Sequence, residues 1–154
     1  MAVDKFPKLK ELTLKYPERG ILSFVADGPI AMWAPVVIVA PAAGETLPRV
    51  DTTTSSNDVN VIGIAAGGSG DVAGTGNAAD AAGDVVDVIP IHSAAITKVV
   101  VNAVLSLGAL VGTTTVAGRA DAASATTPSY VLGKLFQLSS TIGDTVLIFM
   151  GGSK

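Results

Sequence analysis

The sequence lacks most of the residues that carry protein chemistry. It contains no cysteine and one histidine, His92. This excludes disulfides and thiolate metal ligands, and it leaves any zinc site dependent on three carboxylates, an unusual ligand set. A G-x-S-x-G segment, the nucleophile turn of many serine hydrolases, is also missing. These absences predict that the chain is not an enzyme, has no catalytic residues and binds no metal ion or cofactor.

Charged and aromatic residues are scarce. Charged residues are 15% of the 154-residue chain, whereas about 25% is usual in a soluble domain. Aromatic residues are 5% and hydrophobic residues 49%, with a mean hydropathy of +0.55. So few charges cannot cover the surface of a small domain, so we expect part of that surface to contact other protein. The composition indicates a homo-oligomer or a component of a protein lattice.

The chain also lacks a long hydrophobic run. The longest one, residues 29–43, is interrupted by Pro35 and Pro41 and is shorter than the roughly 20 residues that a membrane-spanning helix needs. The first ten residues, MAVDKFPKLK, contain no apolar signal core. The net charge is −3, and outside the first twenty residues basic side chains are not interleaved with aromatic ones. We therefore expect neither a membrane nor a nucleic acid as a partner.

Basic residues are concentrated at the N-terminus, where five of the ten lie within residues 1–20. Pro7 and Pro17 bracket this segment's leucines, whose spacing fits neither a helix nor strict strand alternation. We interpret residues 1–20 as a docking arm and 21–154 as a separate β domain; a solvated tail or a first edge strand is the alternative. The candidate docking residues of the arm are its apolar and basic side chains: Lys5, Phe6, Lys8, Leu9, Lys10, Leu12, Leu14, Lys15, Tyr16 and Arg19.

The β domain repeats itself. VIGIA at 61–65 corresponds to VLGKL 70 residues later, and GDVVDV at 83–88 corresponds to GDTVLI 60 residues later. The first copy therefore carries about ten extra residues, and 25–37 loosely matches 101–111. Similarity at a fixed spacing indicates a repeated structural unit, although two valine-rich strands can also match by chance. We predict tandem half-repeats at about 21–91 and 97–150.

Short valine-rich segments separated by turn residues are typical of β-strands. The strands that we expect are 21–26, 36–40, 47–50, 59–65, 85–91, 93–101, 104–111, 113–117, 130–138 and 145–150. Residues 66–82 consist almost wholly of small side chains, so we expect a mobile, exposed loop inserted in the first half-repeat. The predicted fold class is all-β, a small β-barrel or β-sandwich built from two tandem half-repeats, with an extended N-terminal arm.

Two motifs inside this insertion suggest ligand binding. GSGDVA at 68–73 fits the glycine pattern of dinucleotide-binding turns, but that site needs a following helix, and no amphipathic helix is expected here. Asp71, Asp80, Asp84 and Asp87 could surround a hard cation such as calcium. A solvated acidic loop is the simpler interpretation, and we predict no bound nucleotide or metal.

Met32 and Trp33 precede a proline in Ala-Met-Trp-Ala-Pro. A single tryptophan at a turn can be a core residue, or it can anchor a protein contact, since tryptophan and methionine are enriched at interfaces. We take Met32 and Trp33 as the candidate oligomer interface.

The order of motifs in the second half resembles the capsid decoration, or head cement, proteins of tailed viruses and bacteriophages. The segments that carry the resemblance are 103–104, 108–111 (GALV), 118–120 (GRA), 131–133 (VLG) and 143–148 (GDTVLI). It implies a structural virion protein, made in the host cytoplasm, that binds the outer surface of an assembled icosahedral capsid and stabilises it. The implied partners are the major capsid protein and further copies of the chain, with a trimer favoured. The N-terminal arm would reach onto the capsid, although neither the lysine-rich arm nor the Gly/Ala insertion has a counterpart in the matched motifs.

The alternative function is a carbohydrate- or receptor-binding β module of a virion spike or fibre. Such a module needs exposed aromatic platforms, and the chain has only seven aromatic residues. Three of these, Phe6, Tyr16 and Phe24, lie in or near the arm.

Overall fold

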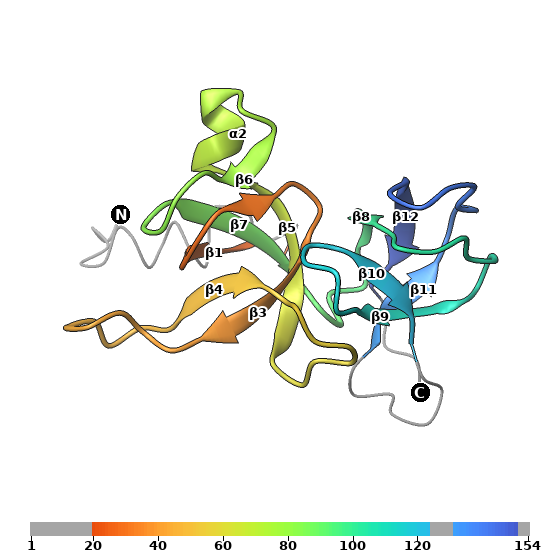
Figure 1. The fold of residues 1–154 in the computed structure, drawn as a ribbon, viewed down its shortest axis with the longest axis horizontal. Coiled ribbons are helices and arrows are strands. Elements are labelled where there is room, and N and C mark those ends of the chain that lie inside the picture. Colours follow the sequence, from red (N-terminus) through yellow and green to blue (C-terminus); the bar gives the residue numbers. More distant parts are fainter. Residues whose placement is uncertain (1–19, 124–130, 151–154) are drawn as a thin grey trace, which may run out of the picture.

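The protein is built almost entirely from antiparallel β-strands (Figure 1). The computed structural model describes residues 20–123 and 131–150. Within these ranges there is one helix, and it is five residues long. The predicted all-β fold class is therefore confirmed.

The strands form two five-stranded sheets, one from each half of the described chain. We call residues 20–91 unit 1; its sheet has the order β1-β7-β5-β3-β4, from β1 (Leu22–Val25), β3 (Pro35–Val39), β4 (Arg49–Thr52), β5 (Val61–Gly68) and β7 (Val85–Pro90). We call residues 95–150 unit 2; its sheet has the order β8-β12-β11-β9-β10, from β8 (Ile96–Val100), β9 (Leu110–Thr113), β10 (Ala120–Ala122), β11 (Val131–Leu135) and β12 (Thr145–Phe149). When the strands of each unit are counted along the chain, the two sheets have the same strand order.

Each sheet curls until its two edges touch at a single point. Ala26, just after β1, forms a parallel bridge with Val50 of β4, and Val101, just after β8, forms the equivalent bridge with Ala120 of β10. One bridge does not close a ladder between edge strands, so the sheets are strongly curved but are not closed barrels. The predicted barrel or sandwich is thus realised as two curled sheets.

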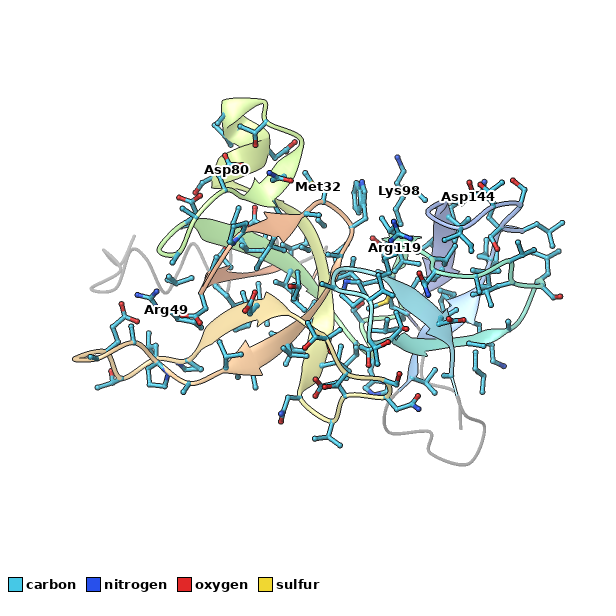
Figure 2. All side chains as sticks on the ribbon, in the orientation of Figure 1. Met32, Arg49, Asp80, Lys98, Arg119 and Asp144 are labelled. Carbon is cyan, nitrogen blue, oxygen red and sulfur yellow. The ribbon has the colours of Figure 1, made fainter. Side chains whose placement is uncertain are left out.

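Alternation of buried and exposed side chains explains the strand that follows the repeated Gly-Asp pair in each unit, β7 in unit 1 and β12 in unit 2. Val86 and Val88 of β7 are fully buried while Val85 is exposed, and β12 repeats this pattern with Val146 and Ile148 buried. Side chains of successive strand residues point to opposite faces, as the stick view displays along both sheets (Figure 2). The period of two is therefore the local cause of both strands.

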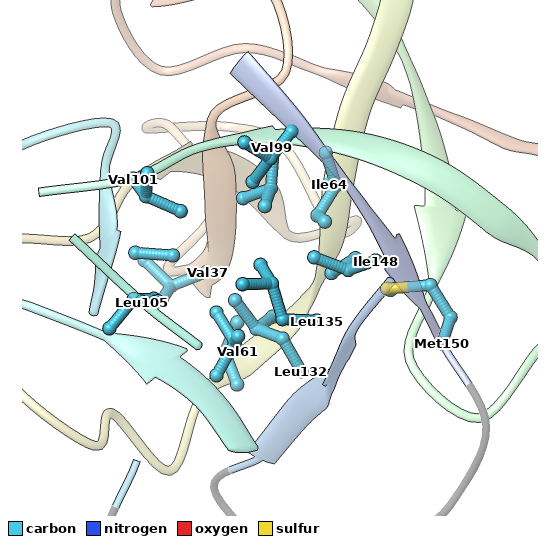
Figure 3. Close-up of a cluster of buried hydrophobic side chains, with 13 residues drawn as sticks. Val37, Val61, Ile64, Val99, Val101, Leu105, Leu132, Leu135, Ile148 and Met150 are labelled. Carbon is cyan, nitrogen blue, oxygen red and sulfur yellow. The ribbon is translucent and has the colours of Figure 1, made fainter. Parts of the chain in front are cut away.

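The core has two parts, and one of them joins the units. A cluster within unit 1 includes Val36, Val86 and Val88. The other cluster combines Val37 and Ile64 of unit 1 with unit 2 side chains, which include Val99, Val101, Leu132, Leu135, Ile148 and Met150 (Figure 3). Adjacent residues of β3 thus enter different clusters, which explains why Val36 and Val37 are both buried, whereas Ile38 is exposed.

The insertion at 66–82 contains regular secondary structure, so the prediction of a loop throughout was wrong, although residues 71–76 and 80–82 are exposed as expected. It contains the end of β5, helix α2 (Ser69–Ala73) and strand β6 (Asn77–Ala79), which pairs with β2 (Ile30–Ala31). Ala78 and Ala79 are fully buried. Small side chains serve close packing here, because a Cβ at Gly68 would overlap the backbone of β6 and β7. Composition alone did not separate close packing from mobility.

Two strand predictions in unit 2 were also wrong. Residues 104–109, expected to belong to a strand at 104–111, lie in a connecting loop, and β9 begins only at Leu110. Residues 114–117, beyond the end of β9, are likewise not in a strand. Across the described ranges, no helix has the length and hydrophobicity needed to cross a membrane.

Candidate docking surfaces

The predicted docking residues of the arm, from Lys5 to Arg19, lie outside the described residues. The description begins at Gly20, which lies beside Ser93 in the segment that links the two units. Gly20 therefore lies close to the segment that joins the two units. The role of the arm remains a prediction.

Met32 and Trp33, the candidate oligomer interface, lie in the turn between β2 and β3. Both are partly buried, and Trp33 belongs to neither core cluster. The Trp33 amide donates to the carbonyl of Ala65 (2.8 Å), and its own carbonyl accepts from the amide of Val100 in unit 2 (3.3 Å). In Figure 2 Met32 lies on unit 1 and Lys98 on unit 2. The turn thus connects the two units.

A cation–π contact holds the indole of Trp33 at this junction. The Nζ atom of Lys98, on β8, lies 5.4 Å from the ring centroid, within the range in which the ring quadrupole attracts an ammonium. The backbone of Trp33 has a φ of 64°, a left-handed conformation uncommon for residues with a side chain. The ring therefore has a contact within the chain, and its predicted contact with another subunit is not tested by this geometry.

The repeated Gly-Asp pair forms the same turn in both units. The Asp84 carboxylate accepts hydrogen bonds from the amides of Asp80 and Ala81. The Asp144 carboxylate accepts the equivalent bonds from Ser140 and Thr141, and it also accepts bonds from both of their hydroxyls. These bonds, that of the Thr141 hydroxyl above all, lower the pKa of Asp144 below its ordinary value. The two turns thus share one pattern of hydrogen bonds, in which the aspartate carboxylates stabilise the turn.

The acidic residues in and just after the insertion also act within the fold. Asp87 accepts a hydrogen bond from the hydroxyl of Ser23 (2.6 Å), and Asp80 accepts one from that of Thr75 (2.8 Å). In the described part of the chain, no three or more histidine, aspartate or glutamate side chains are grouped so that they could hold a metal ion. His92 is exposed in the segment between the units. The carboxylates thus stabilise turns and strand pairing.

The largest group of exposed apolar side chains was missed by the sequence analysis. Five large hydrophobic residues of unit 2 are between 60% and 66% exposed, and we call them the unit 2 end: Val104, Leu107, Phe136, Leu138 and Ile142. They lie on two loops, 101–109 and 136–144, at the side of unit 2 that faces away from unit 1 (Figure 1). Monomers rarely expose contiguous apolar patches without a functional reason.

Hydrogen bonds hold these two loops side by side. The hydroxyl of Ser139 accepts from the amide of Leu105 and donates to the carbonyl of Ala103. The amide of Gly143 donates to the carbonyl of Val101 (2.8 Å), and the amide of Gly108 donates to that of Leu135 (2.9 Å). The two loops that carry the unit 2 end therefore lie side by side. A sequence signal existed: the second copy has Phe136, Leu138 and Ile142 where the longer first copy has mainly glycine and alanine.

No protein-family model and no curated protein matches this sequence. Among solved structures, the chain is similar to the head fibre gp8.5 N base of bacteriophage phi29, with a TM-score of 0.55 and 17% sequence identity. The match covers 87% of this chain and 97% of that chain. The chain therefore shares its fold with a phage head fibre base over nearly the whole length of both proteins.

Proposed function

We propose that this chain is a structural protein of a bacteriophage virion that binds the outer surface of the assembled capsid and stabilises it. The observation that supports this most is the fold shared with a phage head fibre base, along 87% of this chain and 97% of that one. The motifs of unit 2 that resemble capsid decoration proteins add independent support from the sequence. A scarcity of charge, at 15% of residues, suits a protein that works in contact with other protein.

In this proposal the chain stabilises the capsid by multivalent binding. A capsid is a lattice of repeated major capsid proteins, so an oligomer of this chain would engage several capsid subunits at once. Binding at linked sites gives high avidity without a strong single contact. In this proposal the N-terminal arm docks on the capsid through its apolar and basic side chains. Copies of the chain, in a trimer, meet near Met32 and Trp33.

The test is the number of copies of this chain in purified virus particles, relative to the major capsid protein. A ratio near one to one is the expected result for a decoration protein that covers the shell. Absence from particles would remove the proposal.

The arm has its own test. Deletion of residues 1–20 is expected to abolish capsid binding while the β domain keeps its fold, because the described strands of both sheets begin at Leu22. Capsid binding that survives the deletion undiminished would contradict docking through the arm.

A second candidate function is the base of a spike or fibre that carries a carbohydrate- or receptor-binding module. It is favoured by the head fibre base among similar structures. A few copies per particle would favour it over decoration, and a glycan array probed with the purified chain would test its binding activity.

A further inference from the structure

Unit 1 provides an internal reference for the unit 2 end. At the equivalent end of unit 1, α2 and β6 contact β5, and Ile30 of β2, which pairs with β6, is fully buried. The second copy replaces the 17 residues 66–82 with the seven residues 136–142. It therefore has no counterpart of α2 or β6, and its end is open.

Equivalent hydrogen bonds align the two ends residue by residue. The amide of Trp33 donates to the carbonyl of Ala65, as that of Gly108 donates to Leu135; the amide of Ala65 donates to Ala34, as that of Leu135 donates to Ala109. The first loop therefore aligns with an offset of 75 residues and the second with an offset of 70.

At two of three aligned positions the unit 2 end carries the larger side chain, and at the third the two side chains are of similar size. Where unit 1 has Pro29, Met32 and Ala66, unit 2 has Val104, Leu107 and Phe136. In unit 1 Pro29 is exposed and Met32 and Ala66 are only partly buried, and polar side chains are the expected residues on a surface that faces water. The opposite is observed, which indicates that another protein surface covers the unit 2 end.

The charge pattern identifies the covering surface. Segments 101–118 and 135–143, which hold the unit 2 end, contain no charged residue. Charged residues stand directly beside these segments: Arg119 follows the first, and Lys134 and Asp144 flank the second. A lysine-rich arm would gain no ion pair here and would have to desolvate its charges. A second copy of this chain presents the same uncharged apolar surface, so both surfaces are buried without unpaired charge.

We propose that the unit 2 end is a self-association surface, covered by the unit 2 end of another copy of this chain. Like surfaces that meet around a rotation axis give a closed assembly. A stable interface buries about 800 Å² per partner, so the five side chains form its apolar centre and the two loops form its rim. This surface is distinct from the predicted interface at Met32 and Trp33.

The first experiment measures the mass of the purified full-length chain by sedimentation velocity across protein concentrations. Wild type is expected to be oligomeric, and Phe136→Glu is expected to weaken association at least about 100-fold, because it places a charge in the apolar centre. Val72→Glu is the matched control, since Val72 is 90% exposed on α2 of unit 1 and should leave the mass unchanged. A monomeric wild type, or wild-type mass in Phe136→Glu, would overturn the proposal.

A second experiment does not depend on disruption. The chain has no cysteine, so Ile142→Cys introduces a single thiol into the unit 2 end. Mild oxidation is expected to form disulfide-linked pairs of this variant but not of Val72→Cys. Equal linking in both variants would contradict the proposal, as would dissociation by Trp33→Ala but not by Phe136→Glu.

These measurements need no virus particle, so their outcome is separable from that of the proposed virion function. A chain that associates through the unit 2 end yet is absent from particles would keep this inference and lose the virion role. A monomeric chain whose Phe136→Glu variant no longer binds capsids would assign the surface to the capsid protein and overturn self-association.

Discussion

Unit 1 and unit 2 have the same sheet and differently built ends. The amide of Ala26 donates to the carbonyl of Asp84 in unit 1 (2.8 Å), and the amide of Val101 donates to that of Asp144 in unit 2 (2.9 Å). The strand order is also the same. The connection before the repeated Gly-Asp pair differs most, by ten residues, and the connection between β3 and β4 is also longer than that between β9 and β10. The comparison teaches that strand pairing defines the unit, whereas the connections decide which surfaces stay open.

The largest expected effect tests what the units share. A Cβ at Gly63 would overlap the carbonyl oxygen of Ile89, and one at Gly133 would overlap that of Phe149. Gly63→Ala and Gly133→Ala are each expected to lower the free energy of unfolding by at least about 3 kcal/mol, because the backbone of a paired strand must move. Chemical denaturation of both variants measures this.

Gly28→Ala is the control for these variants, since its added Cβ would meet only ordinary van der Waals contacts. If Gly133→Ala lowers the free energy of unfolding and Gly63→Ala does not, the two units share their strand pairing but not its contribution to stability.

The next effect tests what differs between the ends. Ile30→Ala removes a fully buried side chain of β2, which pairs with β6, and is expected to cost about 2–5 kcal/mol of unfolding free energy. Phe136→Ala, at a side chain that is 60% exposed, is expected to change it by less than about 0.5 kcal/mol. Denaturation at protein concentrations low enough to keep the chain monomeric makes the comparison.

The concentration matters because association adds stability to any surface that it buries. If Phe136→Ala is as damaging as Ile30→Ala in the monomer, Phe136 is packed within its own chain and the unit 2 end is not open.

A smaller effect concerns the acidic turns. Asp144 accepts hydroxyl bonds that Asp84 lacks, so Asp144→Ala is expected to lower the melting temperature more than Asp84→Ala. Because folding lowers the pKa of Asp144, its contribution is present above the ordinary aspartate pKa of about 3.9 and is lost as the pH falls below it. Thermal melts of wild type and Asp144→Ala should therefore converge towards acid pH. A difference that grows at low pH would contradict this assignment.

The smallest effect concerns the junction of the units. Lys98→Ala removes the ammonium above Trp33 and is expected to cost about 0.5–1 kcal/mol. Trp33 is the only tryptophan, so its fluorescence reports the change directly. Lys134→Ala, at another exposed lysine of unit 2, is the control and should leave the emission of Trp33 unchanged.

The sequence predicted those features that depend on neighbouring residues. The period of two in Val85–Val88 and Thr145–Ile148 predicted β7 and β12, and the repeated Gly-Asp pair predicted equivalent turns. Residues 66–82 were predicted wrongly because glycine and alanine are compatible with both mobility and close packing. Whether such a segment packs closely depends on the strands that it contacts, here β2 and β7. The unit 2 end was missed for a similar reason: Phe136 and Leu138 extend a strand-like pattern, and exposure depends on what covers them.

The sequence by itself determined the all-β class, because alternating and β-branched residues favour strands over any helix in the chain. It also determined the repetition, since the same residues recur at the same turns. Only the tertiary structure decided that Val36 and Val37 enter different core clusters and that one unit's end is covered while the other is open. Burial is a property of contacts between residues far apart in the chain, and the local pattern specifies only which face of a strand each side chain occupies.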